Sequence, residues 1–158
     1  MVKLVNGDMF SGDESYKVHQ VNCKGAMGAG IAKTIKEKYP KVYEKYKHVC
    51  NTQTNSSDLL GKVQVVKVIE KGFYIVNLFG QDNYHSASGR CTNYEAFYTC
   101  LEKLREYIYR NPDGEKTVAF PYKIASNLAG GDWNVILSMI KSVFENTDIE
   151  VTIYNYTL

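Results

Sequence analysis

The sequence predicts an α/β fold in which a mixed β-sheet carries helices on both faces. Short apolar segments bounded by Gly, Asn or Asp alternate with segments of helical periodicity over most of the 158 residues. Two of the strand-to-helix junctions are rich in glycine. The length is enough to bury a sizeable core, and no internal repeat or long linker divides the chain. We therefore expect one domain over residues 1–158.

Six segments are expected to be strands because each is short and rich in Val, Ile, Phe or Tyr. They are Val2–Val5, Lys17–Asn22, Lys62–Ile69, Phe73–Phe79, Thr117–Pro121 and Glu150–Tyr154. The third and fourth are separated by Glu70, Lys71 and Gly72, and this spacing predicts a hairpin.

Helices are expected between these strands. Ala29–Tyr39 follows the first glycine-rich junction, Pro40 interrupts it, and Val42–Val49 resumes the helical character. A further helix is predicted by apolar residues that recur at helical spacing, and "TNYE" (residues 92–95) before it fits a capping box that begins at Thr92. These apolar residues are Phe97, Leu101, Leu104 and Ile108.

The last helix is expected to open at Asp132 and to bury an apolar stripe. The stripe consists of Ile136, Met139, Ile140, Val143 and Phe144.

Composition excludes several classes of protein. The net charge of +2 is too small to imply nucleic-acid binding by itself. No apolar run approaches the roughly 20 residues of a membrane span, and the N-terminus lacks the pattern of a signal peptide. The four cysteines show no metal-ligand spacing, so we expect reduced thiols, no metal site and no cofactor. We expect a monomer in the cytoplasm, without a membrane partner.

The first glycine-rich junction is "VNCKGAMGAGIAKTI", residues 21–35. A strand runs into Gly25, Gly28 and Gly30, and a helix follows at once. Backbone N–H groups at a helix N-terminus can bind an anion where small residues allow it to approach. The spacing is neither that of the dinucleotide fingerprint nor that of a P-loop. Taken alone, the junction is equally compatible with close packing of helix on strand.

The second junction repeats this plan. In "TVAFPYKIASNLAGGDWNVI" (residues 117–136), a strand leads through Gly130 and Gly131 into a helix. Loops that follow parallel strands gather at the carboxyl edge of the sheet, where α/β proteins bind ligands. Two such loops facing each other would hold a diphosphate from both sides.

These motifs resemble those of the macro domains. The resemblance covers nearly the whole chain, and the motifs are specific in combination and in order. They are "VNGDMF", "VNCKGAMGAGIA", "NLFGQDNYH", "GRCTNYEAF", "AFPYKIASNLAGGDWNV" and "TDIEVTIYNYTL". The chain is most similar to the small single-domain group that contains ADP-ribose 1″-phosphate phosphatases and terminal ADP-ribose glycohydrolases. The resemblance implies a three-layer α/β/α sandwich that binds a small-molecule ADP-ribose derivative between the two glycine loops.

The resemblance also implies contacts for each part of the ligand. Asp8 would accept a hydrogen bond from the adenine amino group, beside Met9, and Tyr154 and Asn155 would line the adenine pocket. Asn22 would hold the distal ribose. The distal ribose and the diphosphate would lie between the two loops, whose expected contacts are Gly25, Met27, Gly28, Ala29, Gly30, Ile31, Ser126, Asn127, Leu128, Ala129, Gly130 and Gly131.

Departures from the family pattern narrow the chemistry. Ala32 stands where one large subgroup of hydrolases carries an acidic residue after the glycine run. Gly80 or Gln81 stands where other glycohydrolases place a lysine. The second loop has Ala125, Ser126 and Asn127 where relatives usually show Gly, Cys and Gly. A lysine adduct and an acid-dependent mechanism are therefore not expected.

The remaining pattern is that of the phosphatases. His19 lies in the strand before the first loop, and Asp132 opens the helix after the second. Such a pair could protonate a leaving group and orient a water. The candidate catalytic residues are Asp132, His19 and Asn22. Asp132 could instead only cap its helix, and His19 could be a buried core residue.

Other functions stay open at this point. The chain could remove ADP-ribose from a protein, a nucleic acid or an O-acyl ester, or it could bind ADP-ribose, or an ADP-ribosylated macromolecule, without turnover. His85 and Arg90, in "QDNYHSASGR", could line the distal site. The lysines between residues 33 and 47 could contact a nucleic acid, but Glu37 and Glu44 interrupt them, which is more typical of a solvated helical face.

Overall fold

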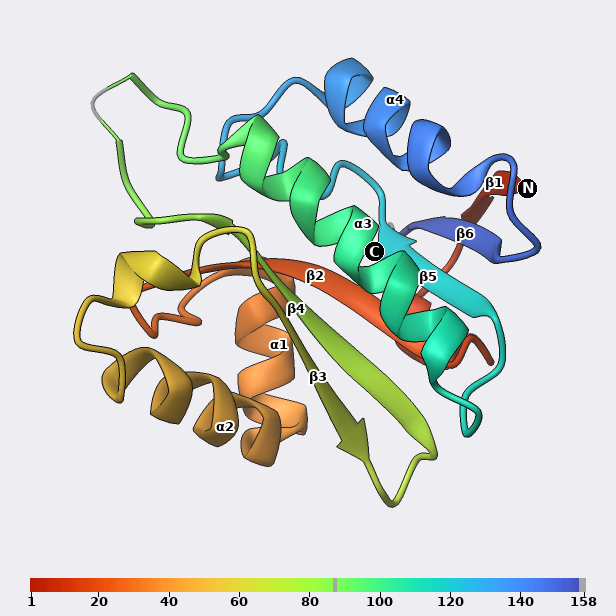
Figure 1. Ribbon diagram of the computed structural model, residues 1–158, viewed down its shortest axis with the longest axis horizontal. Coiled ribbons are helices and arrows are strands. Elements are labelled where there is room, and N and C mark those ends of the chain that lie inside the picture. The colour runs from red at the N-terminus through yellow and green to blue at the C-terminus, as the bar shows by residue number, and fades with distance from the viewer. Residues whose placement is uncertain (87, 157–158) are drawn as a thin grey trace.

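The computed structural model describes residues 1–86 and 88–156, so the last two residues of the motif at 147–158 lie outside the described part. The fold is a three-layer α/β/α sandwich built on a six-stranded mixed sheet (Figure 1). In spatial order its strands are β1 (Val2–Asn6), β6 (Glu150–Asn155), β5 (Thr117–Pro121), β2 (Tyr16–Asn22), β4 (Phe73–Gln81) and β3 (Val63–Val68).

Five strands of the sheet run parallel, and β3 pairs with β4 antiparallel through the predicted hairpin. The parallel strands are covered by helices on both faces, which explains why β2, β4 and β5 are buried along nearly their whole length. Because these strands share one direction, the loops after β1, β2, β4, β5 and β6 all emerge at the same edge of the sheet.

Helices α1 (Gly30–Lys38) and α2 (Pro40–Asn51) cover one face, and α3 (Tyr94–Arg110) and α4 (Trp133–Phe144) cover the other (Figure 1). The first pair packs on a core that contains Ile35 and Tyr46, both fully buried. The second pair packs on a larger core that contains Phe97 and Ile140. Two 3₁₀ turns, η1 (Met9–Ser11) and η2 (Ser56–Leu59), complete the elements. Within the described ranges, no helix is both long enough and apolar enough to cross a membrane.

The expected elements all form, with shifts at their ends. The strand expected at Thr117–Pro121 has these same bounds in β5. β4 extends two residues beyond the expected Phe79, to Gln81. Pro40 was expected to interrupt a helix, but it is the first residue of α2, where its missing N–H costs nothing.

The expected capping box at Thr92 is wrong. Asn93 caps α3, and its Oδ1 accepts a hydrogen bond from Ala96 N at 2.9 Å. Thr92 is buried and donates its hydroxyl to Ala125 O at 2.7 Å, so it serves the second glycine loop instead.

We expect Asn93→Ala to lower the free energy of unfolding by about 1 kcal/mol, because three of the four first N–H groups of a helix depend on caps or water. Asn93→Asp keeps the acceptor and should leave the unfolding free energy nearly unchanged. Urea unfolding of the two variants beside the parent protein measures the difference. Equal stability of Asn93→Ala and the parent would contradict the assigned cap.

Candidate functional site

A cavity of about 640 Å³ lies at the carboxyl edge of the sheet, where β2, β4 and β5 end. Its walls come from three places: the end of β2 with the loop that leads into α1, the residues after β4, and the loop between β5 and α4. The two glycine loops thus face each other across one cavity, as the sequence predicted. We refer to the segment 23–29 as the first loop and the segment 122–131 as the second loop.

The cavity brings together some of the predicted residues and leaves others outside. Those that line it are His19, Asn22, Gly28, Ala29, Gly30, Ile31, Asn127, Leu128 and Ala129. Predicted residues that do not line it are Asp8, Met9, Gly25, Met27, Ser126, Gly130, Gly131, Asp132, Tyr154 and Asn155. Sequence reasoning missed other lining residues, among them Gln20, Gln81, Tyr84, Tyr122 and Lys123.

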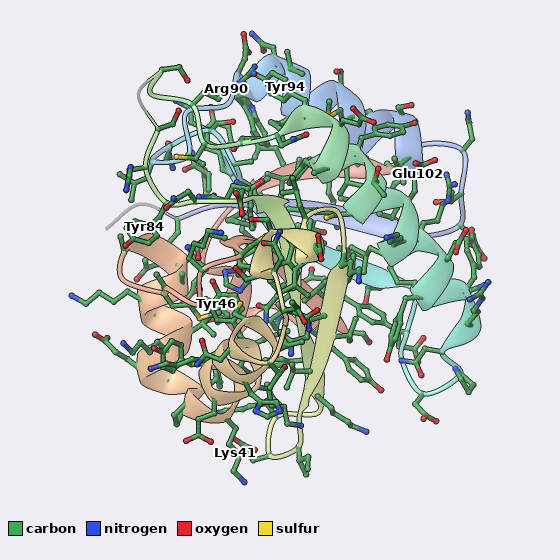
Figure 2. The ribbon with its side chains drawn as sticks, turned by 60° about the vertical axis from the view of Figure 1, so that its left-hand side comes forward. Lys41, Tyr46, Tyr84, Arg90, Tyr94 and Glu102 are labelled. Carbon is green, nitrogen blue, oxygen red and sulfur yellow. The ribbon has the colours of Figure 1, made fainter. Side chains whose placement is uncertain are left out.

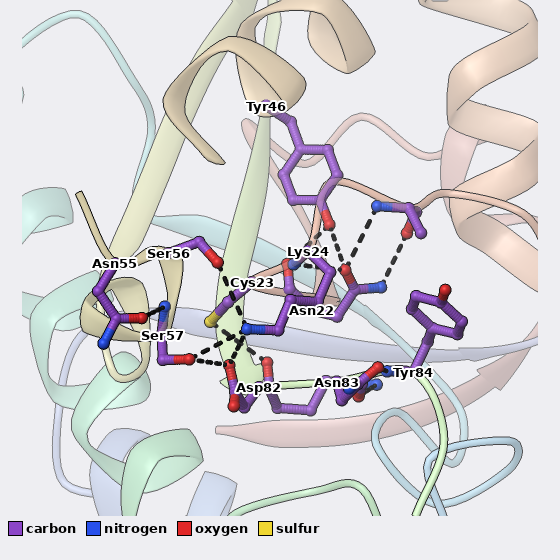
Figure 3. A network of polar contacts seen from close by, with 12 residues as sticks. Asn22, Cys23, Lys24, Tyr46, Asn55, Ser56, Ser57, Asp82, Asn83 and Tyr84 are labelled. Carbon is purple, nitrogen blue, oxygen red and sulfur yellow. Dashed lines mark hydrogen bonds and ion pairs between the residues drawn. The ribbon is translucent and has the colours of Figure 1, made fainter. Parts of the chain in front are cut away.

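The side chain of Asn22 organises the first loop rather than standing free (Figure 3). Its Oδ1 accepts from Lys24 N at 2.9 Å and from Ala26 N at 3.3 Å, and its Nδ2 donates to Ala26 O at 2.8 Å. The Tyr46 hydroxyl donates to Asn22 from α2, with distances of 2.6 Å to the backbone O and 2.8 Å to Oδ1. Burial raises the pKa of Tyr46, so this hydroxyl keeps its proton. Asn22 therefore fixes the loop around the distal end of the cavity.

The first turn of α1 presents backbone donors to the cavity. Ala29 is the N-cap residue and makes no side-chain cap, and no acidic residue lies in the first turn. Gly30, Ile31 and Ala32 line the cavity. Their N–H groups are the orphan donors of a helix N-terminus, which carries a partial positive charge. A Cβ at Gly28 would meet nothing within 4 Å, so an anion can approach these donors closely.

The second loop is held from behind by the segment that precedes α3. Cys91 N and Thr92 N both donate to Ala129 O, at 2.8 and 3.1 Å. A Cβ at Gly130 would collide with the backbone of Gly89 and approach Arg90 Cα to 3.0 Å. The missing side chain of Gly130 therefore makes room for this neighbouring segment and not for a ligand.

Internal hydrogen bonds also determine which N–H groups of the second loop face a ligand. Gly130 N donates to Asn127 O and Gly131 N donates to Ala125 O, at 3.2 and 2.9 Å. The N–H groups of Asn127, Leu128 and Ala129 have no partner in the described part of the chain. Ala125 adopts φ 64°, a left-handed conformation that costs a non-glycine residue roughly 1–2 kcal/mol. The two hydrogen bonds to its carbonyl, from Gly131 N and Thr92 Oγ1, hold it there.

A pair of glutamines stands where some glycohydrolases carry a lysine. Gln20 Nε2 donates to Gln81 Oε1 at 2.7 Å and to Thr92 Oγ1 at 3.0 Å. Gln81 Nε2 in turn donates to Asn83 O at 2.8 Å. Gly80 gives space for the Gln20 amide, whose Oε1 would collide with any Cβ at that position. Neither glutamine supplies an amine nucleophile.

Lys24 of the first loop is engaged outside the cavity (Figure 3). Its Nζ lies 3.1 Å from Asp82 Oδ1 and 3.0 Å from Ser57 Oγ. Burial opposes ionisation of Asp82, but the Ser57 hydroxyl and Lys24 outweigh it and lower the pKa of this carboxyl. This cluster ties the first loop to η2 and to the end of β4.

His19 is buried to 97% and lines the cavity. Its Nε2 lies 2.5 Å from Asn77 Oδ1, and Asn77 Nδ2 donates to Gln64 Oε1, so the asparagine oxygen is the acceptor and His19 Nε2 carries the proton. His19 Nδ1 is a buried lone pair without a partner in the described part of the chain. Burial lowers the pKa of His19 to about 4, and the Asn77 contact only partly opposes this. The imidazole is therefore neutral at pH 7 and acts as an acceptor, not as an acid.

Asp132 is the N-cap of α4. Its Oδ1 accepts from Asn134 N at 2.8 Å, its own N–H donates to Tyr94 Oη at 2.9 Å, and its side chain is exposed. The structure thus favours the capping role, and the catalytic role of Asp132 stays a prediction.

Arg90 and His85 do not line the cavity either. The Arg90 guanidinium lies over the Tyr94 ring, 4.5 Å from its centre, and the two residues are neighbours in Figure 2. His85 packs edge-on against Tyr84, a 60% exposed aromatic at the rim of the cavity.

The residues expected at the adenine end lie along the same sheet edge, beyond the cavity. Asp8 caps η1 by accepting from Phe10 N at 2.9 Å. Tyr154 pairs in register with Pro121 of β5, and Tyr122 N donates to Tyr154 O. Asn155 accepts from Gly7 N. The ends of β1 and β6 are therefore contiguous with the cavity wall formed after β5.

No group of three or more His, Cys, Asp or Glu residues within 1–86 and 88–156 could hold a metal ion. The donors that face the cavity are backbone N–H groups, amides and one neutral imidazole. This set is suited to an uncharged or anionic ligand.

The buried neutral His19 should make stability fall in acid. Its pKa rises from about 4 in the folded protein to its ordinary value near 6.5 in the unfolded chain. The unfolded state therefore binds more protons between these values, and stability is lost as pH falls from 6.5 to 4. At pH 5 the parent should lose about 2 kcal/mol relative to pH 7 through this group. The measurement is urea unfolding at both pH values, with His19→Gln as the control that lacks the titration. The same loss in His19→Gln would contradict the assignment.

Known proteins resemble this chain over nearly its full length. Human ADP-ribose glycohydrolase OARD1 is 32% identical over 154 residues, which cover 97% of this chain and 90% of the relative. The ADP-ribose 1″-phosphate phosphatase of Meyerozyma guilliermondii is 28% identical, covering 89% of this chain and 92% of the relative. A solved structure of a Bacteroides thetaiotaomicron protein of unknown function has a TM-score of 0.83 at 25% identity and covers 98% of each chain. The family model described as Macro domain matches residues 18–140, and the chain therefore belongs to the Macro domain family.

Proposed function

We propose that the protein binds ADP-ribose along the carboxyl edge of its sheet and hydrolyses the phosphate ester of ADP-ribose 1″-phosphate. The observation that carries the proposal is the facing pair of donor sets. The uncapped first turn of α1 and the free N–H groups of Asn127, Leu128 and Ala129 lie on opposite walls of one cavity. A diphosphate between them would receive hydrogen bonds from both sides.

The chemistry proposed is attack of a water on phosphorus. His19 Nδ1, the unpartnered acceptor, would take a hydrogen bond from the water and orient its oxygen. The bond between phosphorus and the 1″-oxygen breaks, that oxygen leaves as the hydroxyl of ADP-ribose, and the water oxygen becomes part of inorganic phosphate. Because His19 is neutral, the proton that the leaving oxygen gains comes from the water. Relatives named as phosphatases and as glycohydrolases both support hydrolysis of an ADP-ribose derivative.

Two alternatives remain defined by observations. Removal of ADP-ribose from a macromolecule is supported by the OARD1 relative, but no lysine occupies the position of Gln81. Binding without turnover is the second alternative. The deciding experiment mixes the protein with ADP-ribose 1″-phosphate and measures free phosphate. Release of phosphate supports the proposal. Tight binding of ADP-ribose without release would replace it by the reader function.

We expect Gly28→Val to abolish measurable binding of ADP-ribose while the melting temperature stays within about 2 °C of the parent. The side chain would enter open cavity space, and Gly28 does not adopt a left-handed conformation, so no strain follows. Calorimetry with ADP-ribose in the presence of EDTA measures the affinity. The matched variant Gly130→Ala should instead lower the melting temperature, because its Cβ meets the Gly89 backbone. Parent-like binding by Gly28→Val would refute the position of the diphosphate.

Turnover should separate His19 from Asp132. His19→Gln keeps an N–H donor toward Asn77 but removes the free lone pair, and we expect phosphate release to fall by roughly 10²-fold. Asp132→Asn caps a helix about as well as aspartate, so its turnover should stay within about twofold of the parent. Both are measured as phosphate release from ADP-ribose 1″-phosphate, with ADP-ribose affinity from the same preparations. A loss of about 10²-fold in Asp132→Asn would restore the catalytic role of its carboxylate.

A further inference from the structure

Lys17, on the face of β2 that carries α1 and α2, is a fully buried cation. Its Nζ donates to Met9 O at 2.7 Å and to Gly12 O at 2.9 Å, and it lies 4.9 Å from the centre of the Phe73 ring. Burial of an unpaired ammonium is costly, so a lysine is retained inside a protein only where such partners hold it. Both hydrogen bonds go to the segment that follows β1.

A second buried charge links Lys17 to β6. Glu14 Oε1 lies 4.0 Å from Lys17 Nζ, and the Tyr154 hydroxyl lies 2.9 and 2.8 Å from the two carboxylate oxygens of Glu14. Gly12 leaves space for this contact, because a Cβ there would collide with both Glu14 Oε1 and the Tyr154 hydroxyl. The chain of contacts thus runs from the backbone of 9–12 through Lys17 and Glu14 to the last strand.

The segment that this chain fixes contains Asp8 and Met9. Asp8 caps η1 through Phe10 N, and Met9 is 97% buried beside the lysine. The direction of the Asp8 carboxylate therefore depends on the backbone path of η1, which Lys17 holds by two of its four residues from 9 to 12. None of the side chains in this cluster lines the cavity, and the hydrolysis proposed above does not use them.

We propose that Lys17 is a positioning residue for nucleobase selection: it holds the segment 8–12 so that the Asp8 carboxylate accepts a hydrogen bond from the amino group of adenine. The inference rests on the proposed function, because it places the adenosine half of the ligand at the ends of β1 and β6. The Glu14–Tyr154 contact restrains the same segment from the other side. Burial lowers the pKa of Lys17, whereas the charge of Glu14 opposes that change and favours the ammonium form.

The test compares two ligands that differ at the amino group. Calorimetry gives the dissociation constants of ADP-ribose and of inosine diphosphate ribose, in which an oxygen replaces that amino group. The parent should prefer ADP-ribose by about 10-fold or more, as expected for one hydrogen bond to a charged acceptor. Lys17→Met keeps an apolar stem of similar length and removes the ammonium. It should reduce the preference to less than about threefold, chiefly by weakening ADP-ribose.

A merely structural role of Lys17 would weaken both ligands equally and leave their ratio unchanged, and that result would overturn the inference. Lys116→Met is the matched control, since it removes an exposed lysine paired with Asp148 at 3.0 Å, and it should keep the parent ratio. If Lys17→Met does not fold, Tyr154→Phe decides, because it removes only the hydroxyl bound to Glu14; an unchanged ratio there overturns the inference. A parent that binds neither ligand refutes the proposed function itself. A parent that binds both equally leaves that function standing and refutes only the selection by Asp8.

Discussion

The parallel pairing of β2 with β4 and β5 is the constraint on which the site depends. It sends the segments after these strands to one edge, so that residues more than 100 positions apart, such as Asn22 and Asn127, face the same cavity. The hairpin that adds β3 antiparallel lies at the far end of the sheet and leaves this edge undisturbed. Because β1 and β6 are also parallel to the others, their ends extend the same edge toward the residues expected to meet adenine.

Within this edge, the chain divides its polar groups between holding the loops and facing the cavity. The Asn22 side chain, the Gly130 and Gly131 N–H groups and the Thr92 hydroxyl are all used internally. The first turn of α1 and the segment 127–129 are left with unused N–H groups on opposite walls. Loops that satisfied every donor internally would be equally stable but could not hold an anion. The left-handed backbone of Ala125 belongs to the same arrangement, since its carbonyl accepts two of the bonds that shape the second loop.

The fold and the two loops were predictable, because apolar periodicity, turn residues and the order of the glycine motifs are local features of the sequence. Which individual residues touch the cavity was less predictable. Gly130 looks like Gly28 in a sequence, yet the space beside it is filled by Gly89, a neighbour 41 positions earlier. Thr92 fitted a capping box, yet its hydroxyl is drawn to Ala125 O of the second loop, and Asn93 takes over the cap. The buried Lys17 gave no signal, since a lysine in a strand is usually solvated. These differences all arise from contacts between distant segments, which no local pattern records.

The electrostatics of the cavity are consistent with a ligand that brings its own charge. Lys123 is the one cationic side chain among the described lining residues, and His19 is kept neutral by burial. Attraction for a diphosphate therefore has to come chiefly from oriented N–H dipoles, which act over short distances and require the anion to be in contact. A fixed cation would hold phosphate groups from further away and in many orientations. N–H donors reward only the ligand that fits between the loops, so the same arrangement that binds a diphosphate also fixes the position of the distal ribose beside His19. In a site of this kind, binding geometry and catalytic geometry are set by the same backbone, and the loop anchors at Asn22 and Thr92 serve both.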